Sequence, residues 1–175
     1  FGTQVARRLK FRTRFWTGSE YREQELPGPD NFRQWLACWR VFCTICRSLQ
    51  LVAAAALTAY ERNILKLSDL YPDCCGLIYE ADVWCRGEIL EELRRKLEKR
   101  HASAGVGAVP LWDAAAPWSA VFLEASGAEQ VEGLGGADGA LFWRKNVVDP
   151  AVTCIARGRP GASRNQLPNA QSAQG

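Results

Sequence analysis

The sequence contains no methionine and only one histidine, His101, among its 175 residues. A chain that begins with Phe1 and lacks methionine is expected to be a fragment of a longer protein. His101 lies at the cationic end of a predicted helix, where capping is a more common role than catalysis. No Gly-x-Ser-x-Gly motif occurs either. Because no recognisable set of catalytic roles is present, we do not expect an enzyme.

The chain also lacks long apolar runs, a signal peptide and Asn-x-Ser/Thr glycosylation sites. The longest apolar run, Leu51 to Ala59, covers about half of a bilayer, so neither a transmembrane helix nor a membrane partner is predicted. The seven cysteines are an odd number, which argues against a disulfide framework. These features favour a reducing intracellular compartment, cytoplasmic or nuclear, over secretion.

The first pattern that the sequence does contain is that of a basic β-strand, within residues 1–29. Basic residues occupy every second position from 8 to 14, with mostly apolar residues between them, which is strand periodicity. Thr17-Gly18-Ser19 is a turn signal, and residues 20–26 alternate more weakly. We therefore predict a β-hairpin with an adjoining linker. Since an isolated hairpin is marginal in water, it is expected to pack on the next domain.

The basic strand has two interpretations. Its cations can bind phosphates while aromatic rings stack on bases of RNA or DNA, or they can keep an edge strand soluble. Residues 31–100 hold 11 Lys/Arg against 9 Asp/Glu, so the basic excess is concentrated in the hairpin. We favour the edge strand and keep nucleic-acid binding as a hypothesis. Its candidate contacts are Arg8, Lys10, Arg12, Arg14 and Trp16.

Residues 30–101 carry helical periodicity and are predicted to form a helical domain. One helix starts at Phe32 after an N-cap at Asp30 or Asn31, a second covers Leu51 to Leu67, and a third covers Cys74 to Arg100. Acidic and basic residues four apart in the third helix are typical of a solvated face. These pairs are Asp82–Arg86, Glu91–Arg95 and Glu92–Lys96.

The first predicted helix combines an aromatic face with a Cys-x-x-Cys motif. Cys43 and Cys46 share this face, because residues three and four apart lie together on a helix. No second Cys pair or His pair follows, and Cys43 lies too far from the helix N-terminus for redox chemistry. We interpret both cysteines as packing residues and predict no metal and no cofactor. The aromatic face forms a bundle core or a self-association surface. Its residues are Trp35, Trp39, Phe42 and Trp84.

Residues 102–175 are rich in glycine and alanine and are expected to form a mostly disordered tail. Two short apolar pieces stand out within it, Pro117 to Leu123 and Ala140 to Val148. The glycine run from Gly133 to Gly139 lacks both a preceding buried strand and a following Lys-Ser/Thr. It therefore does not qualify as a phosphate loop.

A set of motifs lies within about residues 9–95. It consists of the basic strand, Glu25-Leu-Pro-Gly-Pro29, Trp35, Trp39, Val41-Phe42, Ala59-Tyr60-Glu61, Leu70-Tyr-Pro72, Ala81-Asp82, Arg86 and Glu88. In this order the motifs resemble an uncharacterised segment that recurs in predicted proteins of dinoflagellate algae. Such segments occur in retroelement-like reading frames, so the resemblance implies a Gag-like or accessory role.

The sequence thus predicts an α+β fold, in which an N-terminal β-hairpin packs on a bundle of two to three amphipathic helices and a disordered tail follows. The expected function is a non-enzymatic assembly or nucleic-acid-associated module of a retroelement-like protein, with self-association and RNA or DNA as partners. One alternative is a protein-interaction helical domain with no nucleic-acid role. Another is an inactive fragment of a larger enzyme. No small-molecule substrate is predicted.

Overall fold

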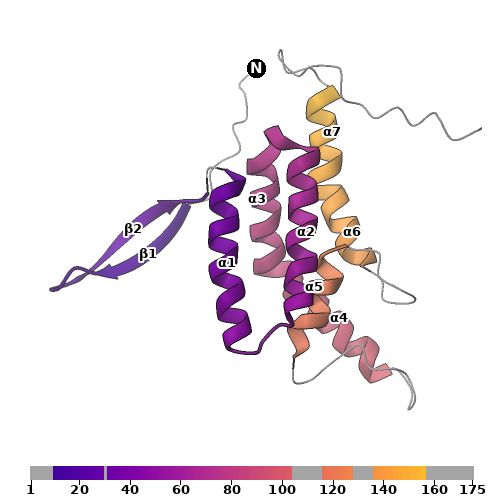
Figure 1. Cartoon of the computed structure of the whole chain (residues 1–175), viewed down its shortest axis with the longest axis horizontal. Coiled ribbons are helices and arrows are strands. Elements are labelled where there is room, and N and C mark those ends of the chain that lie inside the picture. Colours follow the sequence, from indigo (N-terminus) through magenta and orange to yellow (C-terminus); the bar gives the residue numbers. More distant parts are fainter. Residues whose placement is uncertain (1–9, 30, 104–115, 128–135, 157–175) are drawn as a thin grey trace, which may run out of the picture.

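The computed structural model describes residues 10–29, 31–103, 116–127 and 136–156 (Figure 1). These ranges contain one antiparallel hairpin and five helices, of which two are interrupted by a π-helical segment. None of these helices is long and apolar enough to cross a membrane. The elements are β1 (Lys10–Trp16), β2 (Tyr21–Pro27), α1 (Phe32–Ser48), α2 (Ala54–Leu70), η1 (Pro72–Cys74), α3 (Cys75–Trp84), η2 (Cys85–Ile89), α4 (Leu90–Ser103), α5 (Pro117–Ala125), α6 (Ala137–Trp143), η3 (Arg144–Val148) and α7 (Asp149–Ala156).

The predicted hairpin and its turn are confirmed. Gly18 has φ +101° at the turn, a conformation that favours glycine, and β1 pairs antiparallel with β2. The predicted packing of the hairpin on the bundle is wrong for the described side chains. Those from Arg14 to Glu25 are exposed, and Figure 1 shows the hairpin projecting away from the helices. Cross-strand contacts hold it together internally, including the Arg14–Glu23 ion pair at 2.7 Å and the Trp16–Tyr21 ring contact.

Helix α1 begins as the sequence predicts. The side chain of Asn31 caps it by accepting a hydrogen bond from the backbone N–H of Gln34 at 3.0 Å. Four aromatic rings then stack along one face with centroid separations of 5.2, 5.5 and 5.2 Å. Because about every turn of this stretch carries a ring on the same face, the face buries a large apolar area. The ladder consists of Phe32, Trp35, Trp39 and Phe42.

The centre of the core is Tyr60 on α2, whose side chain is fully buried. Its ring contacts Trp39 of α1 at 5.2 Å, Phe122 of α5 at 5.4 Å and Trp143 of α6 at 5.9 Å. These partners come from residues 39 to 143, so the helices enclose one continuous core. The bundle therefore depends on residues well beyond position 101.

The structure corrects the expected tail at residues 117–125 and 137–156, which form α5 and the α6–η3–α7 helix. Val121 and Val147 are completely buried in the common core. Helix α5 shows too few turns for its periodicity to be recognised, and the start of the α6–η3–α7 helix lies in a glycine-rich stretch of the sequence. The rest of the predicted tail, residues 104–115, 128–135 and 157–175, lies outside the described residues.

Candidate functional site

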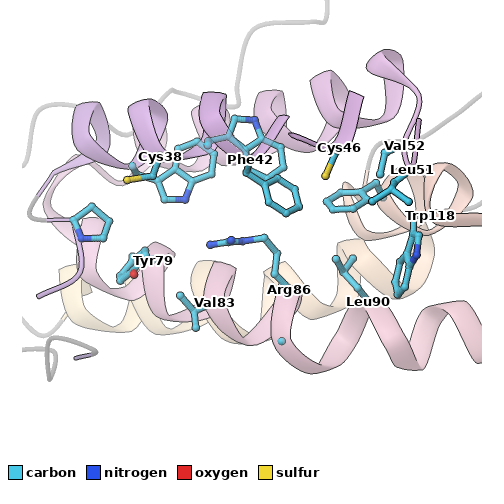
Figure 2. Close-up of a pocket in the computed structure, with 15 residues that line it drawn as sticks. Cys38, Phe42, Cys46, Leu51, Val52, Tyr79, Val83, Arg86, Leu90 and Trp118 are labelled. Atoms are coloured by element: carbon cyan, nitrogen blue, oxygen red, sulfur yellow. The ribbon is translucent and has the colours of Figure 1, made fainter. Parts of the chain in front are cut away.

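The main concave feature of the described residues is an apolar groove between α1 and the α3–η2–α4 helix (Figure 2). Its volume is about 640 Å³, within the range typical of small-molecule sites. Tyr79 and Leu90 lie at its two ends along one wall, which at 1.5 Å per residue gives a length of about 17 Å. The lining residues are Pro29, Trp35, Cys38, Trp39, Phe42, Cys46, Leu51, Val52, Tyr79, Val83, Arg86, Gly87, Leu90, Trp118 and Phe122.

The groove is built over a buried polar cluster centred on Asp82, which is 0% exposed. Its carboxylate accepts hydrogen bonds from Trp35 Nε1–H at 2.8 Å and from the Tyr60 hydroxyl at 3.0 Å. Arg86 donates two more, through Nε at 3.0 Å and Nη2 at 2.6 Å. A buried carboxylate needs such partners to remain charged. The cluster therefore ties α1, α2 and α3 together beneath the groove.

Among the described residues that line the groove, Arg86 alone carries a formal charge. Its side chain is 29% exposed, and Figure 2 shows it reaching from the α3–α4 wall toward α1, near Phe42. The guanidinium carbon lies 5.9 Å from the centre of the Phe42 ring, a cation–π contact. Burial opposes this charge, but the hydrogen bonds and charge of Asp82 outweigh it and raise the pKa of Arg86. Arg86 is therefore a fixed cation at neutral pH.

The π-helical segment η2 contains both Arg86 and Gly87. Such segments insert one extra residue per turn and are frequent at functional sites. A Cβ atom added to Gly87 would meet no heavy atom within 4 Å. Gly87 thus leaves open space beside Arg86, where any larger side chain would narrow the groove.

A second, smaller depression lies between α1 and α2 and combines Arg40, Arg47 and Glu61 with Cys43. Glu61 accepts a hydrogen bond from Trp39 Nε1–H at 3.0 Å. Burial, followed by the nearby charge of Glu61, raises the pKa of Cys43 to about 11. At neutral pH its thiol is therefore protonated and a poor nucleophile.

The cysteines of the Cys-x-x-Cys motif pack as predicted. Cys46 is buried in the core, and Cys43 is partly buried against it. All seven cysteines are free thiols, and no group of three or more His, Cys, Asp or Glu residues in the described ranges is placed to hold a metal ion. The motif therefore contributes apolar surface to the core.

The candidate nucleic-acid contacts are only partly described. Arg8 lies outside the described residues, and so do the side chains of Lys10 and Arg12. Arg14 forms an ion pair with Glu23, which reduces its charge toward a phosphate. Trp16 is 56% exposed at the end of the projecting hairpin, beside the exposed Phe15 and Tyr21.

The predicted aromatic interaction face does not form a single surface. Trp35 and Trp39 are buried in the core of the chain, and Phe42 is partly buried against it. Trp84 is 45% exposed and lies elsewhere, with its ring 5.5 Å from that of Phe142 and its Nε1–H bonded to Glu88. Of the two interpretations left open by the sequence, the bundle core therefore applies to Trp35 and Trp39.

Sequence reasoning missed Arg86 as a functional residue because the Asp82–Arg86 pair has the spacing of ordinary surface ion pairs. Its assignment to a solvated face is wrong, since Asp82 is fully buried. One signal was available. The apolar neighbours Ile78, Ala81 and Cys85 place Asp82 on the inward side of the helix.

Comparisons of the chain with protein-family models, with curated proteins and with solved structures found no match.

Proposed function

We propose that the protein is a non-enzymatic binding module whose groove between α1 and α3–η2–α4 holds the apolar part of an elongated amphiphilic ligand. The observation that carries this proposal is the groove itself, about 640 Å³ in volume and lined almost entirely by apolar side chains. Sites for small ligands are typically apolar cavities of this size with a few fixed polar groups. The buried cluster around Asp82 supplies the rigid floor that such a site needs.

The cysteine thiols near the groove are protonated at neutral pH, which supports a non-enzymatic role. Burial raises the pKa of Cys46, and it raises the pKa of Cys85 to about 12. These groups stay protonated at neutral pH and lack the reactivity of a catalytic thiolate. His101 lies at the exposed end of α4, remote in sequence from every groove residue of α3 and η2.

The proposal is tested with decanol, a neutral compound with a medium-length alkyl chain. Titration calorimetry should detect saturable binding to the intact chain, and NMR shifts of backbone amides should concentrate on Cys38, Phe42, Val83 and Leu90. Gly87→Leu, which fills open space in the groove, should abolish binding. Ala55→Leu introduces the same side chain at an exposed position on α2 and should leave binding intact. Equal binding by both variants would overturn the proposal.

A second candidate function is the nucleic-acid contact expected from the basic strand. Its support is the hairpin, which projects from the bundle and carries exposed Phe15, Trp16 and Tyr21 side chains at its outer end. Binding of a single-stranded oligonucleotide should weaken steeply with added salt and should be reduced by Trp16→Ala. A salt-independent signal, or full binding by the variant, would exclude this role. The Gag-like assembly role implied by the sequence resemblance stays a prediction.

A further inference from the structure

We propose that the ligand of the groove carries a carboxylate headgroup, which binds the outward-facing edge of Arg86 while its alkyl chain extends toward Trp118. This inference rests on the proposed function, because it names the headgroup and the orientation of the same ligand. Arg86 stands between Tyr79 on one side and Leu90 and Trp118 on the other (Figure 2). The two ends of the groove therefore differ in chemistry.

Arg86 has hydrogen-bonding capacity that its protein partner does not use. A guanidinium has five N–H donors, and Asp82 accepts one from Nε and one from Nη2. Among the described residues no acceptor is paired with Nη1. An unpaired donor in a partly buried groove costs free energy, so a ligand that supplies an acceptor gains affinity. A planar carboxylate matches the planar fork of an arginine best, since it can accept two parallel hydrogen bonds.

The charge around Arg86 favours an anion over a cation. Asp82 is shared among Trp35, Tyr60 and Arg86, and it lies beneath the groove surface, completely buried. A ligand in the groove therefore meets the cation first. No acidic side chain is found among the described residues that line the groove, so a cationic headgroup would meet no counter-charge there and would displace water from Arg86 without compensation.

The orientation of the chain follows from the lining. Beyond Arg86 the described part of the walls includes Cys46, Leu51, Val52, Leu90 and Trp118 and contains no charged group (Figure 2). This half can bury methylene groups, each of which contributes to affinity when removed from water. On the opposite side of Arg86 lie Cys38 and Tyr79 (Figure 2). An alkyl chain therefore gains most by running toward α5.

The test compares three compounds with the same alkyl chain: decanoate, decanol and decyltrimethylammonium. Calorimetry at low ionic strength should show decanoate binding at least tenfold more tightly than decanol, as expected for a charge-assisted hydrogen bond. The ammonium compound should bind more weakly than decanol. A nitroxide at the far end of the decanoate chain should broaden the indole N–H signal of Trp118 more than the amide signal of Tyr79.

Variants separate the headgroup from the groove. Gly87→Leu should abolish binding of decanoate and decanol alike, whereas Arg86→Gln should reduce decanoate affinity to the level of decanol. Since Arg86→Gln leaves Asp82 without its main partner, its folding is first checked by circular dichroism. If it is unfolded, the comparison of the three compounds on the unaltered chain decides the question.

The binding results separate failure of the headgroup inference from failure of the proposed function. Equal affinities of decanoate and decanol overturn the carboxylate headgroup but leave the proposed function intact. Absence of binding by all three compounds overturns both. Groove binding by an acidic amphipathic peptide, without any binding of decanoate, overturns the headgroup inference in favour of a partner helix.

Discussion

At the scale of single residues, Asp82 shows that two ion pairs with the same i,i+4 spacing can differ in burial. Asp82–Arg86 and Glu92–Lys96 are both i,i+4 ion pairs, with separations of 2.6 and 3.0 Å. The first acid is 0% exposed and the second 59%. Removing Asp82 leaves the Trp35 indole, the Tyr60 hydroxyl and the Arg86 guanidinium without their acceptor. The two pairs should therefore differ greatly in their contribution to stability.

We predict that Asp82→Ala lowers the free energy of unfolding by about 3–5 kcal/mol, the usual effect of leaving a buried charge without its partner. Glu92→Ala is the matched control and should change it by less than about 1 kcal/mol, because exposed pairs contribute little. Urea denaturation followed by tryptophan fluorescence measures both. Similar losses in the two variants would contradict the central role of the Asp82 cluster.

Because the Cys85 thiol is buried, we predict that the free energy of unfolding falls at alkaline pH. Burial raises its pKa from 9.0 to about 12 in the folded chain. The unfolded chain releases this proton above about pH 9 while the folded chain retains it, so the free energy of unfolding falls between pH 9 and 12. Below pH 9 the thiol contributes no slope. Cys85→Ala should show a shallower decline than the unaltered chain across this range in denaturation curves recorded at several pH values. Equal slopes would exclude a contribution from Cys85.

At the scale of elements, α1 is followed by a left-handed residue that is a glutamine, where most helices have a glycine. Gln50 has φ +54°, and the N–H groups of Gln50 and Leu51 bond to the carbonyls of Arg47 and Cys46. This is the Schellman arrangement, in which the left-handed residue is most often glycine. A glutamine there carries a steric cost of about 1–2 kcal/mol.

Gln50→Gly should therefore raise the free energy of unfolding by about 0.5–1 kcal/mol, since relief of this strain exceeds the added chain entropy of glycine in the unfolded state. Ser48→Gly serves as the control. It lies inside α1 with helical geometry and should lower stability by about 0.5 kcal/mol. Thermal unfolding of the two variants should shift in opposite directions. A decrease in both would show that the φ of Gln50 is not strained.

Elements with several regular turns could be predicted from the sequence, and those defined by tertiary contacts could not. The hairpin, α1, α2 and the α3–η2–α4 helix all follow from periodicity and turn residues. Helix α5 contains 9 residues, too few for a clear pattern, and the longer α6–η3–α7 helix begins within a glycine-rich stretch that hides its start in the sequence. Gly139 illustrates the difference. In the sequence it belongs to a glycine run, but in the fold a Cβ there would collide with the backbone of Glu124 and Ala125. The missing side chain of Gly139 therefore allows α5 and α6 to approach closely.

The groove could not be predicted for a related physical reason. Four of its lining residues, Trp35, Trp39, Phe42 and Cys46, are apolar positions that the sequence assigns correctly to one face of a helix. Whether two such sides meet or leave a space depends on the separation of their helices. Here the side chains of Phe42 and Arg86 lie in the space between α1 and the α3–η2–α4 helix (Figure 2). Periodicity contains no information about that separation.

At the scale of the whole molecule, the core joins helices that the sequence divided between a domain and a tail. Tyr60 and Trp39 pack against Phe122, and Tyr60 also packs against Trp143. Removing α5 and the α6–η3–α7 helix would expose these rings to water. The burial of each large aromatic side chain contributes about 1.5–3 kcal/mol, and the stability of a whole domain is only about 5–15 kcal/mol.

A chain that ends at Ser103 is therefore expected not to fold cooperatively, although it contains the whole helical domain predicted from the sequence. Its urea denaturation should lack a sigmoidal transition, and its tryptophan emission should shift toward that of exposed indole. The control is a chain that ends at Ala156, which retains every described core residue and should keep the transition of the full sequence. A cooperative transition in the shorter chain would show that α1 to α4 form an independent domain. In that case the groove, which needs Trp118 and Phe122 of α5 for its far end, would be an interface between two units.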